Sequence, residues 1–302
     1  MIRRPPRSTQ GVSSAASDVY KRQIINGLEL QIQTGKEQFQ NLNKMRLIKL
    51  FIFLVFVSCS SSATETSVES EALPFSIINE KILFIGNSFT FYWNLPSQVE
   101  KMSIERGLNW DVRHFTVPSA TLKIHWNNPD LKSLLESETF DHIIIQEHST
   151  NILTNANGNS KFYFDQIRSI IPASTQIHFF STWMYPSMEQ FNIDNDEYPI
   201  EESIKQIIEG TTTKLIPVGR AFKLFQEKYP QFSLLMEDEK HPNSNGSYLA
   251  SCIIFSHLSA ESSLNLSKRY KGIDNKGVDI YYSIVEDEVL PFLQQISDEV
   301  IF

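Results

Sequence analysis

Ile82-Leu83-Phe84-Ile85-Gly86-Asn87-Ser88 is the stretch that decides the fold. Four successive apolar residues suit a strand that is buried on both faces, as strands of parallel sheets are. The glycine ends this run, and the asparagine begins a polar turn. Ligands of such sheets bind beyond the carboxyl ends of the strands. The stretch therefore predicts an α/β fold in which Ser88 lies at the edge where a site would form.

Similar runs recur along the chain and alternate with helical patterns. The predicted strands are 81–85, 111–117, 142–146, 176–181 and 214–218. The predicted helices are 95–106, 131–136, 162–171, 200–209, 221–228, 245–258 and 282–296. This alternation predicts a three-layer α/β/α sandwich with a central five-stranded parallel sheet. We expect one domain, residues 73–302.

The first 44 residues are not expected to belong to the fold. Residues 1–23 resemble the translation of a sequencing-library adapter, although a disordered basic tail is the alternative. Residues 24–44 would then be translated upstream sequence. We therefore give residues 1–44 no structural role.

Residues 45–58 have the pattern of a lipoprotein signal peptide. Arg46 and Lys49 precede a short apolar run, which is too short to span a bilayer. The run ends in Phe56-Val57-Ser58-Cys59, which resembles a bacterial lipobox and implies a lipid on Cys59. An ordinary secretory signal with an incidental cysteine is the alternative. Residues 59–72 have the composition of a flexible tether, so we expect a lipid-anchored protein of the bacterial cell envelope.

Composition excludes several other classes of function. The net charge is −8, and no basic stripe with interleaved aromatic residues is present, so nucleic acid is not an expected partner. The histidines and the two cysteines, Cys59 and Cys252, do not have the spacing of a metal site. No glycine-rich nucleotide motif is found. We expect no metal and no cofactor.

Ser88 gains significance from Asp238 and His241, which occur about 150 positions later in Asp-Glu-Lys-His-Pro. A serine hydroxyl becomes nucleophilic when a histidine takes its proton and a carboxylate orients that histidine. Each motif alone is weak evidence for catalysis. In the second motif, for example, Pro242 and Asn243 also fit the start of a helix. The joint occurrence of the two motifs at element boundaries predicts a serine hydrolase.

Three segments together resemble the SGNH (GDSL-like) hydrolases and a branch of envelope proteins within them. They are Gly86-Asn87-Ser88-Phe89-Thr90, Gln146-Glu147-His148-Ser149 and Asp238-x-x-His241-Pro242. The resemblance implies a flavodoxin-like SGNH fold. It also implies Ser88 as nucleophile, His241 as general base and Asp238 as its orienting carboxylate. Esters of acyl or acetyl groups on glycans, or related envelope or dietary substrates, are the implied substrates.

The resemblance also implies an oxyanion hole, in which two positions depart from the family pattern. The backbone N–H of Ser88 is one implied donor. The usual glycine is replaced in the segment 117–121, so the N–H of Ser119 or Ala120 is the second candidate. The usual asparagine is replaced by Gln146, which either donates its amide or is a buried glutamine that satisfies loop backbone.

Further side chains near these motifs are candidates for lining the pocket: Asn87, Glu147, His148 and Trp183. His125 and Tyr185 are weaker candidates, because such residues are more often locally bonded or packed in a core. Two hypotheses follow. The chain is an envelope esterase, or it is an inactive lipoprotein that uses the cleft to bind a glycan or a protein.

Overall fold

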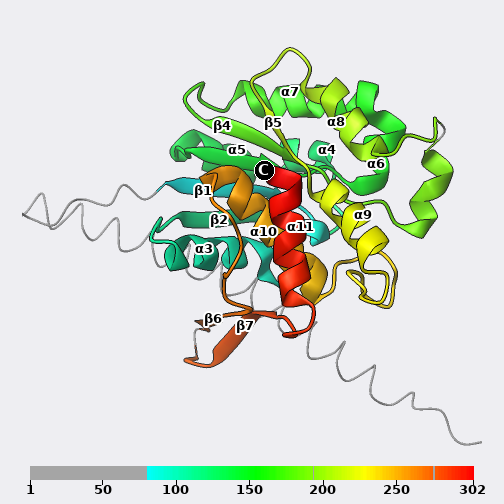
Figure 1. Ribbon diagram of the computed structural model, residues 1–302. Coiled ribbons are helices and arrows are strands. Elements are labelled where there is room, and N and C mark those ends of the chain that lie inside the picture. Colours follow the sequence, from blue (N-terminus) through cyan, green and yellow to red (C-terminus); the bar gives the residue numbers. More distant parts are fainter. Residues whose placement is uncertain (1–79, 193, 275) are drawn as a thin grey trace, which may run out of the picture. The chain divides into compact units, whose positions relative to one another are not determined.

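The computed structural model describes residues 80–192, 194–274 and 276–302, and within them a five-stranded parallel sheet forms the centre. The strand order is β2-β1-β3-β4-β5, as Figure 1 shows. The strands are β1 (Lys81–Gly86), β2 (Asp111–Thr116), β3 (His142–Ile145), β4 (Gln176–Phe180) and β5 (Lys214–Ile216). All five strands were predicted, and the three-layer fold is confirmed.

The order in which successive strands are added to the sheet changes direction at β1, and this determines where the site lies. β1 pairs with β2 on one side and with β3 on the other. From β2 the chain crosses β1 to reach β3, so the strand order switches there. Residues Ile82–Gly86 are all buried, as a strand covered on both faces requires. The residue that follows β1 therefore stands at the topological switch point, where α/β sheets bind ligands.

Helices cover both faces of the sheet. In Figure 1, α10 and α11 lie in front, and α7 and α8 lie beside the edge formed by β4 and β5. The first layer contains α4 (Leu122–Trp126), α5 (Pro129–Ser137), α6 (Ser149–Asn155), α7 (Lys161–Ser169) and α8 (Pro199–Ile208). The second contains α3 (Leu95–Glu105), α9 (Val218–Lys228), α10 (Ser244–Ser259) and α11 (Leu290–Ile301). Short helical segments are α2 (Ser88–Phe91), η1 (Tyr92–Asn94), η2 (Ala156–Ser160) and η3 (Pro186–Phe191).

The predicted helix at 282–296 is wrong in its first half. β6 (Arg269–Ile273) and β7 (Asp279–Ile284) form an antiparallel hairpin, and α11 begins only at Leu290. The carbonyls of β7 are held by other elements: Gln98 donates to the carbonyl of Tyr282 (2.9 Å), and Ser244 donates to that of Ile284 (2.7 Å). These tertiary bonds stabilise an extended backbone there, which local helical spacing does not reveal.

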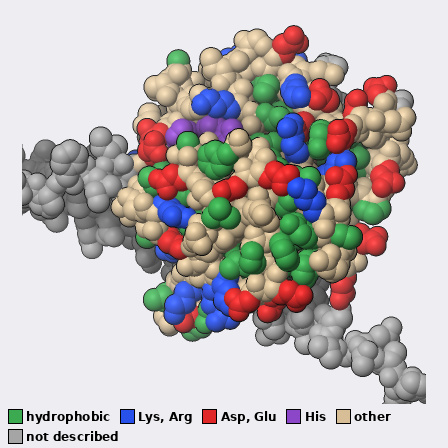
Figure 2. Space-filling view, in the orientation of Figure 1, with side chains coloured by type: hydrophobic (Ala, Val, Ile, Leu, Met, Phe, Trp, Pro, Cys, Tyr) green, Lys and Arg blue, Asp and Glu red, His purple; other side chains and the backbone are tan. Residues whose placement is uncertain are grey.

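A chain of three histidines crosses from β3 through β4 to α10. His178 shares one nitrogen with His142 and the other with His257, each at 3.0 Å. Figure 2 shows histidine side chains reaching the surface beside a basic side chain, while His178 itself is buried. Burial lowers the pKa of His178 to about 3 and that of His257 to about 4. Both histidines are therefore neutral in the folded protein near neutral pH.

The predictions for residues 1–44, the signal peptide 45–58, Cys59 and the tether 59–72 lie outside the described residues and stay predictions. Among the residues described, none of the helices combines the length and the apolar character that crossing a membrane would need.

Candidate active site

The turn after β1 is built to present Ser88. A Cβ on Gly86 would lie 2.2 Å from Thr90 Oγ1 and 2.7 Å from Gln146 Oε1, so only glycine fits there. Asn87 then caps α2, because its side-chain oxygen accepts the N–H of Phe89 at 3.1 Å. Ser88 is the first residue of α2 and is half-buried.

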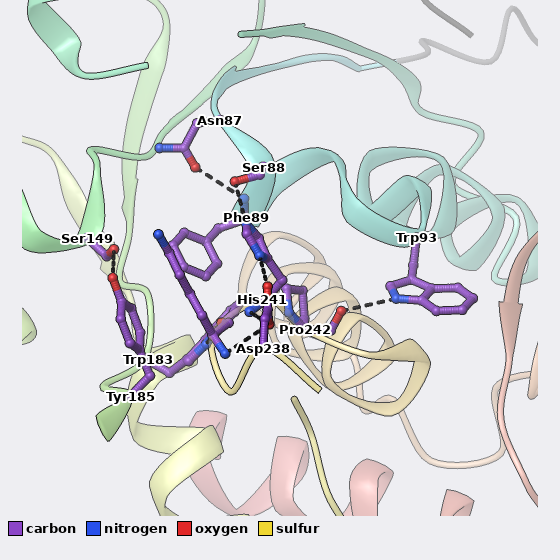
Figure 3. Close-up of polar contacts among 11 residues, drawn as sticks. Asn87, Ser88, Phe89, Trp93, Ser149, Trp183, Tyr185, Asp238, His241 and Pro242 are labelled. Atoms are coloured by element: carbon purple, nitrogen blue, oxygen red, sulfur yellow. Dashed lines mark hydrogen bonds and ion pairs between the residues drawn. The ribbon is translucent and has the colours of Figure 1, made fainter. Parts of the chain in front are cut away.

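The structure brings Ser88, His241 and Asp238 together, although Ser88 and His241 are 153 positions apart. His241 Nε2 lies 2.9 Å from Ser88 Oγ, and His241 Nδ1 lies 2.6 Å from Asp238 Oδ2 (Figure 3). The loop that carries Asp238 and His241 joins α9 to α10. With Nδ1 protonated toward the carboxylate, Nε2 can accept the proton of the serine.

Asp238 is fixed by its own loop. Its Oδ1 accepts the backbone N–H of Lys240 (3.1 Å) and of His241 (3.0 Å). Burial alone would raise the pKa of Asp238, but the hydrogen bonds from His241 and Lys240 outweigh burial and lower this pKa. The carboxylate is therefore ionised at neutral pH and available to stabilise a histidinium.

Aromatic side chains hold the His241 ring in position. Tyr92 stacks on it, with ring centroids 4.4 Å apart and an angle of 8° between the planes. Phe89 packs against it at 5.4 Å. The ring can therefore turn little about its own bonds, which keeps Nε2 directed at Ser88.

Two tryptophans attach the loop on either side of His241. The indole N–H of Trp93 donates to the carbonyl of Pro242, and that of Trp183 donates to the carbonyl of Lys240, each at 3.0 Å (Figure 3). Sequence reasoning missed Tyr92 and Trp93 and assigned Trp183 only to the pocket wall. The aromatic run that directly follows the serine was the one signal available for Tyr92 and Trp93.

The side chain of Gln146 stabilises the turn that carries Ser88 through hydrogen bonds. Its Oε1 accepts the N–H of Asn87 and the hydroxyl of Thr90, both at 2.9 Å, and its Nε2 donates to the carbonyl of Glu147 at 2.5 Å. The side chain is 0% exposed. These contacts match the alternative of a buried glutamine that satisfies loop backbone, and they use one of the two N–H groups of its amide.

The segment that replaces the glycine block forms a tight turn. The N–H of Ala120 donates to the carbonyl of Val117 at 3.1 Å, so this N–H is already used. Ser119 has φ of 56°, a left-handed conformation that glycine adopts most easily. Its N–H has no partner among the described residues. The side-chain amide of Asn87 donates to the carbonyl of Ala120 (3.0 Å), which ties this turn to the serine turn.

Most of the other predicted pocket residues are buried supports rather than lining. Asn87 and Glu147 are each 1% exposed. Glu147 accepts the N–H groups of Leu122 and His148, and burial raises its pKa. His125 is buried and bonded to the carbonyl of Gly86, 3.0 Å away.

His148 is half-buried, and burial followed by the charge of Lys240 lowers its pKa. Trp183 is buried, with Phe222 stacked on it at 4.0 Å. Within the part of the chain that the structure describes, no group of three or more His, Cys, Asp or Glu side chains has the arrangement of a metal site.

Comparison with solved structures identifies the fold. A DUF4886 family protein from Bacteroides uniformis superposes with a TM-score of 0.56 at 17% identity, over 74% of this chain and 95% of that one. The two proteins therefore share the three-layer α/β/α fold.

Two further structures superpose less completely and add nothing to the fold assignment. A family 3 carbohydrate esterase from Clostridium thermocellum has a TM-score of 0.46 and 14% identity, over 59% of this chain and 94% of that one. A lipase/acylhydrolase from Enterococcus faecalis has a TM-score of 0.47 and 16% identity, over 60% and 96%. No protein-family model and no curated protein sequence matches the chain.

Proposed function

We propose that this chain is a serine esterase in which Ser88, His241 and Asp238 form the catalytic triad. One observation carries the proposal: the His241 ring bridges the serine hydroxyl at 2.9 Å and the aspartate carboxylate at 2.6 Å, one nitrogen to each. A binding protein has no use for this pairing. A nucleophile needs both contacts, one to remove its proton and one to orient the base.

The proposed reaction follows from this geometry. His241 Nε2 takes the proton of Ser88 as Oγ attacks the ester carbonyl, and Asp238 stabilises the histidinium through Nδ1–H. His241 then returns the proton to the departing alcohol, which leaves an acyl-enzyme on Ser88. Water attacks the acyl-enzyme with His241 again as base, and the carboxylic acid is released.

The anion that forms on the carbonyl oxygen needs hydrogen-bond donors. We assign this role to the backbone N–H groups of Ser88 and Ser119, neither of which has a partner among the described residues. Of the other two candidates, Ala120 has its N–H engaged, and Gln146 is fully buried with its amide directed at the carbonyl of Glu147. With two donors instead of three, we expect a slow enzyme, since one such donor is worth about 10²–10³ in turnover.

Labelling with a fluorophosphonate probe tests the nucleophile directly. The wild-type protein should be labelled, and Ser88→Ala should not. Ser187→Ala, which removes an exposed serine, is the control and should be labelled like the wild type. Absence of labelling in folded wild-type protein would instead favour a glycan- or protein-binding role for the cleft.

We also propose that the enzyme is held at the cell envelope by a lipid on Cys59. The proposal is supported by the lipobox-like segment and by the tether composition of residues 59–72. In cells supplied with a labelled fatty acid, the wild-type chain should incorporate the label and fractionate with membranes. A Cys59→Ser variant that still incorporates the label would refute the anchor.

A further inference from the structure

Lys240 is a half-buried cation in the loop that carries Asp238 and His241. Its backbone is held on both sides: its N–H donates to Asp238 at 3.1 Å, and its carbonyl accepts the indole N–H of Trp183 at 3.0 Å. Its ammonium lies over the ring of Tyr185, 5.6 Å from the centroid, and makes no hydrogen bond or ion pair with the described residues. A charge that is partly withdrawn from water in this way lacks the anion that would balance it.

Aromatic contacts place this ammonium beside the proposed nucleophile. The ring of Tyr185 lies 6.1 Å from the ring of Phe89, the residue that follows Ser88. The hydroxyl of Tyr185 is also 3.0 Å from that of Ser149, which lies just beyond β3 (Figure 3). Lys240 therefore reaches the carboxyl ends of β3 and β4, at the edge of the sheet where Ser88 is presented.

His148 is a second basic group at this edge. It directly precedes Ser149 and is half-buried. Its Nδ1 is 3.0 Å from the hydroxyl of Thr150, while its Nε2 has no partner among the described residues. Burial lowers the pKa of His148, and the nearby charge of Lys240 lowers it further. The two basic groups are therefore close enough to act on one ligand.

Nζ of Lys240 and Nε2 of His148 are both within reach of a ligand. Within the described residues, the unpartnered side-chain atoms that are closed to solvent belong to other residues. These two nitrogens thus combine the lack of a partner with access from solvent. An ammonium carries three donors and no acceptor, and Nε2 is a donor when Nδ1 accepts the hydroxyl of Thr150. The pair therefore suits an oxygen acceptor, and the charge of Lys240 favours an anionic one.

The carboxylates of the surrounding loops leave this charge available. Asp238 is paired with His241 at 2.6 Å. The carboxylate of Glu147 is buried and accepts N–H groups of the protein with both oxygens. Glu237 and Glu239 are exposed, so solvent screens their charges. None of these four acids forms an ion pair with Lys240.

We propose that Lys240 and His148 bind a carboxylate of the ester that Ser88 cleaves. The reacting carbonyl then lies at Ser88, and the carboxylate of the same molecule lies at the ammonium near Tyr185. The preferred substrates are therefore esters that carry a free acid group. The inference rests on the proposed function for the cleavage by Ser88, whereas the binding of the carboxylate can be measured without it.

Two pairs of esters, each differing only in a carboxylate, test the preference. In 4-acetoxybenzoate and 4-acetoxybenzamide the difference is on the alcohol side of the ester. In monophenyl adipate and the primary amide of its free acid group, the difference is on the acyl side. For at least one pair, the wild type should have a kcat/KM about tenfold higher for the charged member, because hydrogen bonds to charged groups are the stronger ones. The pair that shows the preference identifies the side of the ester that contacts Lys240.

Three variants locate this preference. Lys240→Met keeps the aliphatic stem but removes the charge, so the preference should fall about tenfold. Lys240→Arg keeps the charge and should retain most of the preference. Lys81→Met removes an exposed charge at the first residue of β1, the opposite end of the strand from Ser88, and should keep the wild-type preference. The proposal is overturned if neither pair shows a preference, or if a folded Lys240→Met protein retains it.

Binding without turnover is measured by NMR on the full chain with Ser88→Ala. The chain has seven histidines, and His148→Asn identifies the ring signal of His148. Saturating 4-acetoxybenzoate or monophenyl adipate should raise the pKa of His148, because a neighbouring carboxylate stabilises the histidinium. The two neutral amides should leave this pKa unchanged. If neither carboxylate raises it, the proposal is overturned.

The binding and the chemistry can fail separately. A raised pKa of His148 without hydrolysis of any ester by the wild type would leave the carboxylate site standing and remove the esterase. Hydrolysis of the esters without any preference for the charged members would do the reverse.

Discussion

At the scale of single residues, the position of His241 depends on side chains that take no part in proton transfer. Tyr92 fixes the plane of the ring by stacking, and Trp93 and Trp183 bind the carbonyls on either side of it. A small displacement of a general base lowers the rate strongly, because proton transfer needs hydrogen-bond distance. These residues are therefore expected to act on turnover through His241.

Trp93→Phe tests this dependence. The variant keeps an aromatic ring but loses the bond to the carbonyl of Pro242, which is worth about 1 kcal/mol. We expect kcat for p-nitrophenyl acetate to fall up to about tenfold with KM little changed. Trp126→Phe, which changes a half-buried tryptophan on α4, serves as the control. A folded Trp93→Phe protein with wild-type kcat would show that the loop needs no such attachment.

Ser119→Gly tests the turn that replaces the glycine block. Ser119 has φ of 56°, a conformation that costs an L-residue about 1–2 kcal/mol and that glycine adopts without this steric cost. Because only the backbone N–H is assigned a role, the variant should retain esterase activity and be as stable as wild type or slightly more so. Ser119→Val should have a lower free energy of unfolding than wild type, as measured by chemical denaturation. A large loss of activity in Ser119→Gly would mean that the serine hydroxyl itself takes part.

At the scale of elements, the sheet was predictable because each buried strand is a continuous apolar run between polar turns. Ile143-Ile144-Ile145 illustrates this, since none of the helices within the described residues has three β-branched residues in succession. The β6–β7 hairpin was missed because its backbone is held by Gln98 and Ser244, which are distant in sequence. The same limit applies to the site: the sequence supplied Ser88, Asp238 and His241, but the roles of Gln146 and Trp93 depend on contacts between elements.

The histidine chain across β3, β4 and α10 predicts a pH-dependent stability. The folded pKa of His178 is lowered to about 3, below the ordinary value of 6.5, so the unfolded chain binds this proton first. The stabilising contribution is complete above about pH 6.5 and is lost as the pH falls toward 3. When the pH is lowered from about 7 to about 5, protonation of each such histidine in the unfolded chain should lower the free energy of unfolding by about 2 kcal/mol.

Urea unfolding at these two pH values checks this prediction. His178→Asn should be less stable than wild type at about pH 7, yet it should lose about 2 kcal/mol less than wild type on acidification. His148→Asn changes a half-buried histidine that is not one of the three linked histidines. This variant should keep most of the wild-type dependence of the free energy of unfolding on pH. If the free energy of unfolding fell equally on acidification in wild type and in His178→Asn, this would contradict a neutral His178 in the folded protein.

At the scale of the whole molecule, the described residues 80–192, 194–274 and 276–302 belong to one compact unit. Its site combines the turn after β1 with a loop about 150 residues later, so the site exists only when the unit is folded. A chain of residues 75–302 should therefore unfold in a single transition and react with the fluorophosphonate probe as the full chain does. Loss of labelling in a folded 75–302 protein would show that the preceding residues contribute to the site.

The most direct test of the triad is hydrolysis of p-nitrophenyl acetate by the wild-type protein beside Ser88→Ala, with folding checked by circular dichroism. If Ser88 is the nucleophile, turnover falls to the background rate, by as much as about 10⁶. A folded Ser88→Ala protein that hydrolyses the ester at the wild-type rate would contradict the assignment of Ser88, His241 and Asp238 as the catalytic groups.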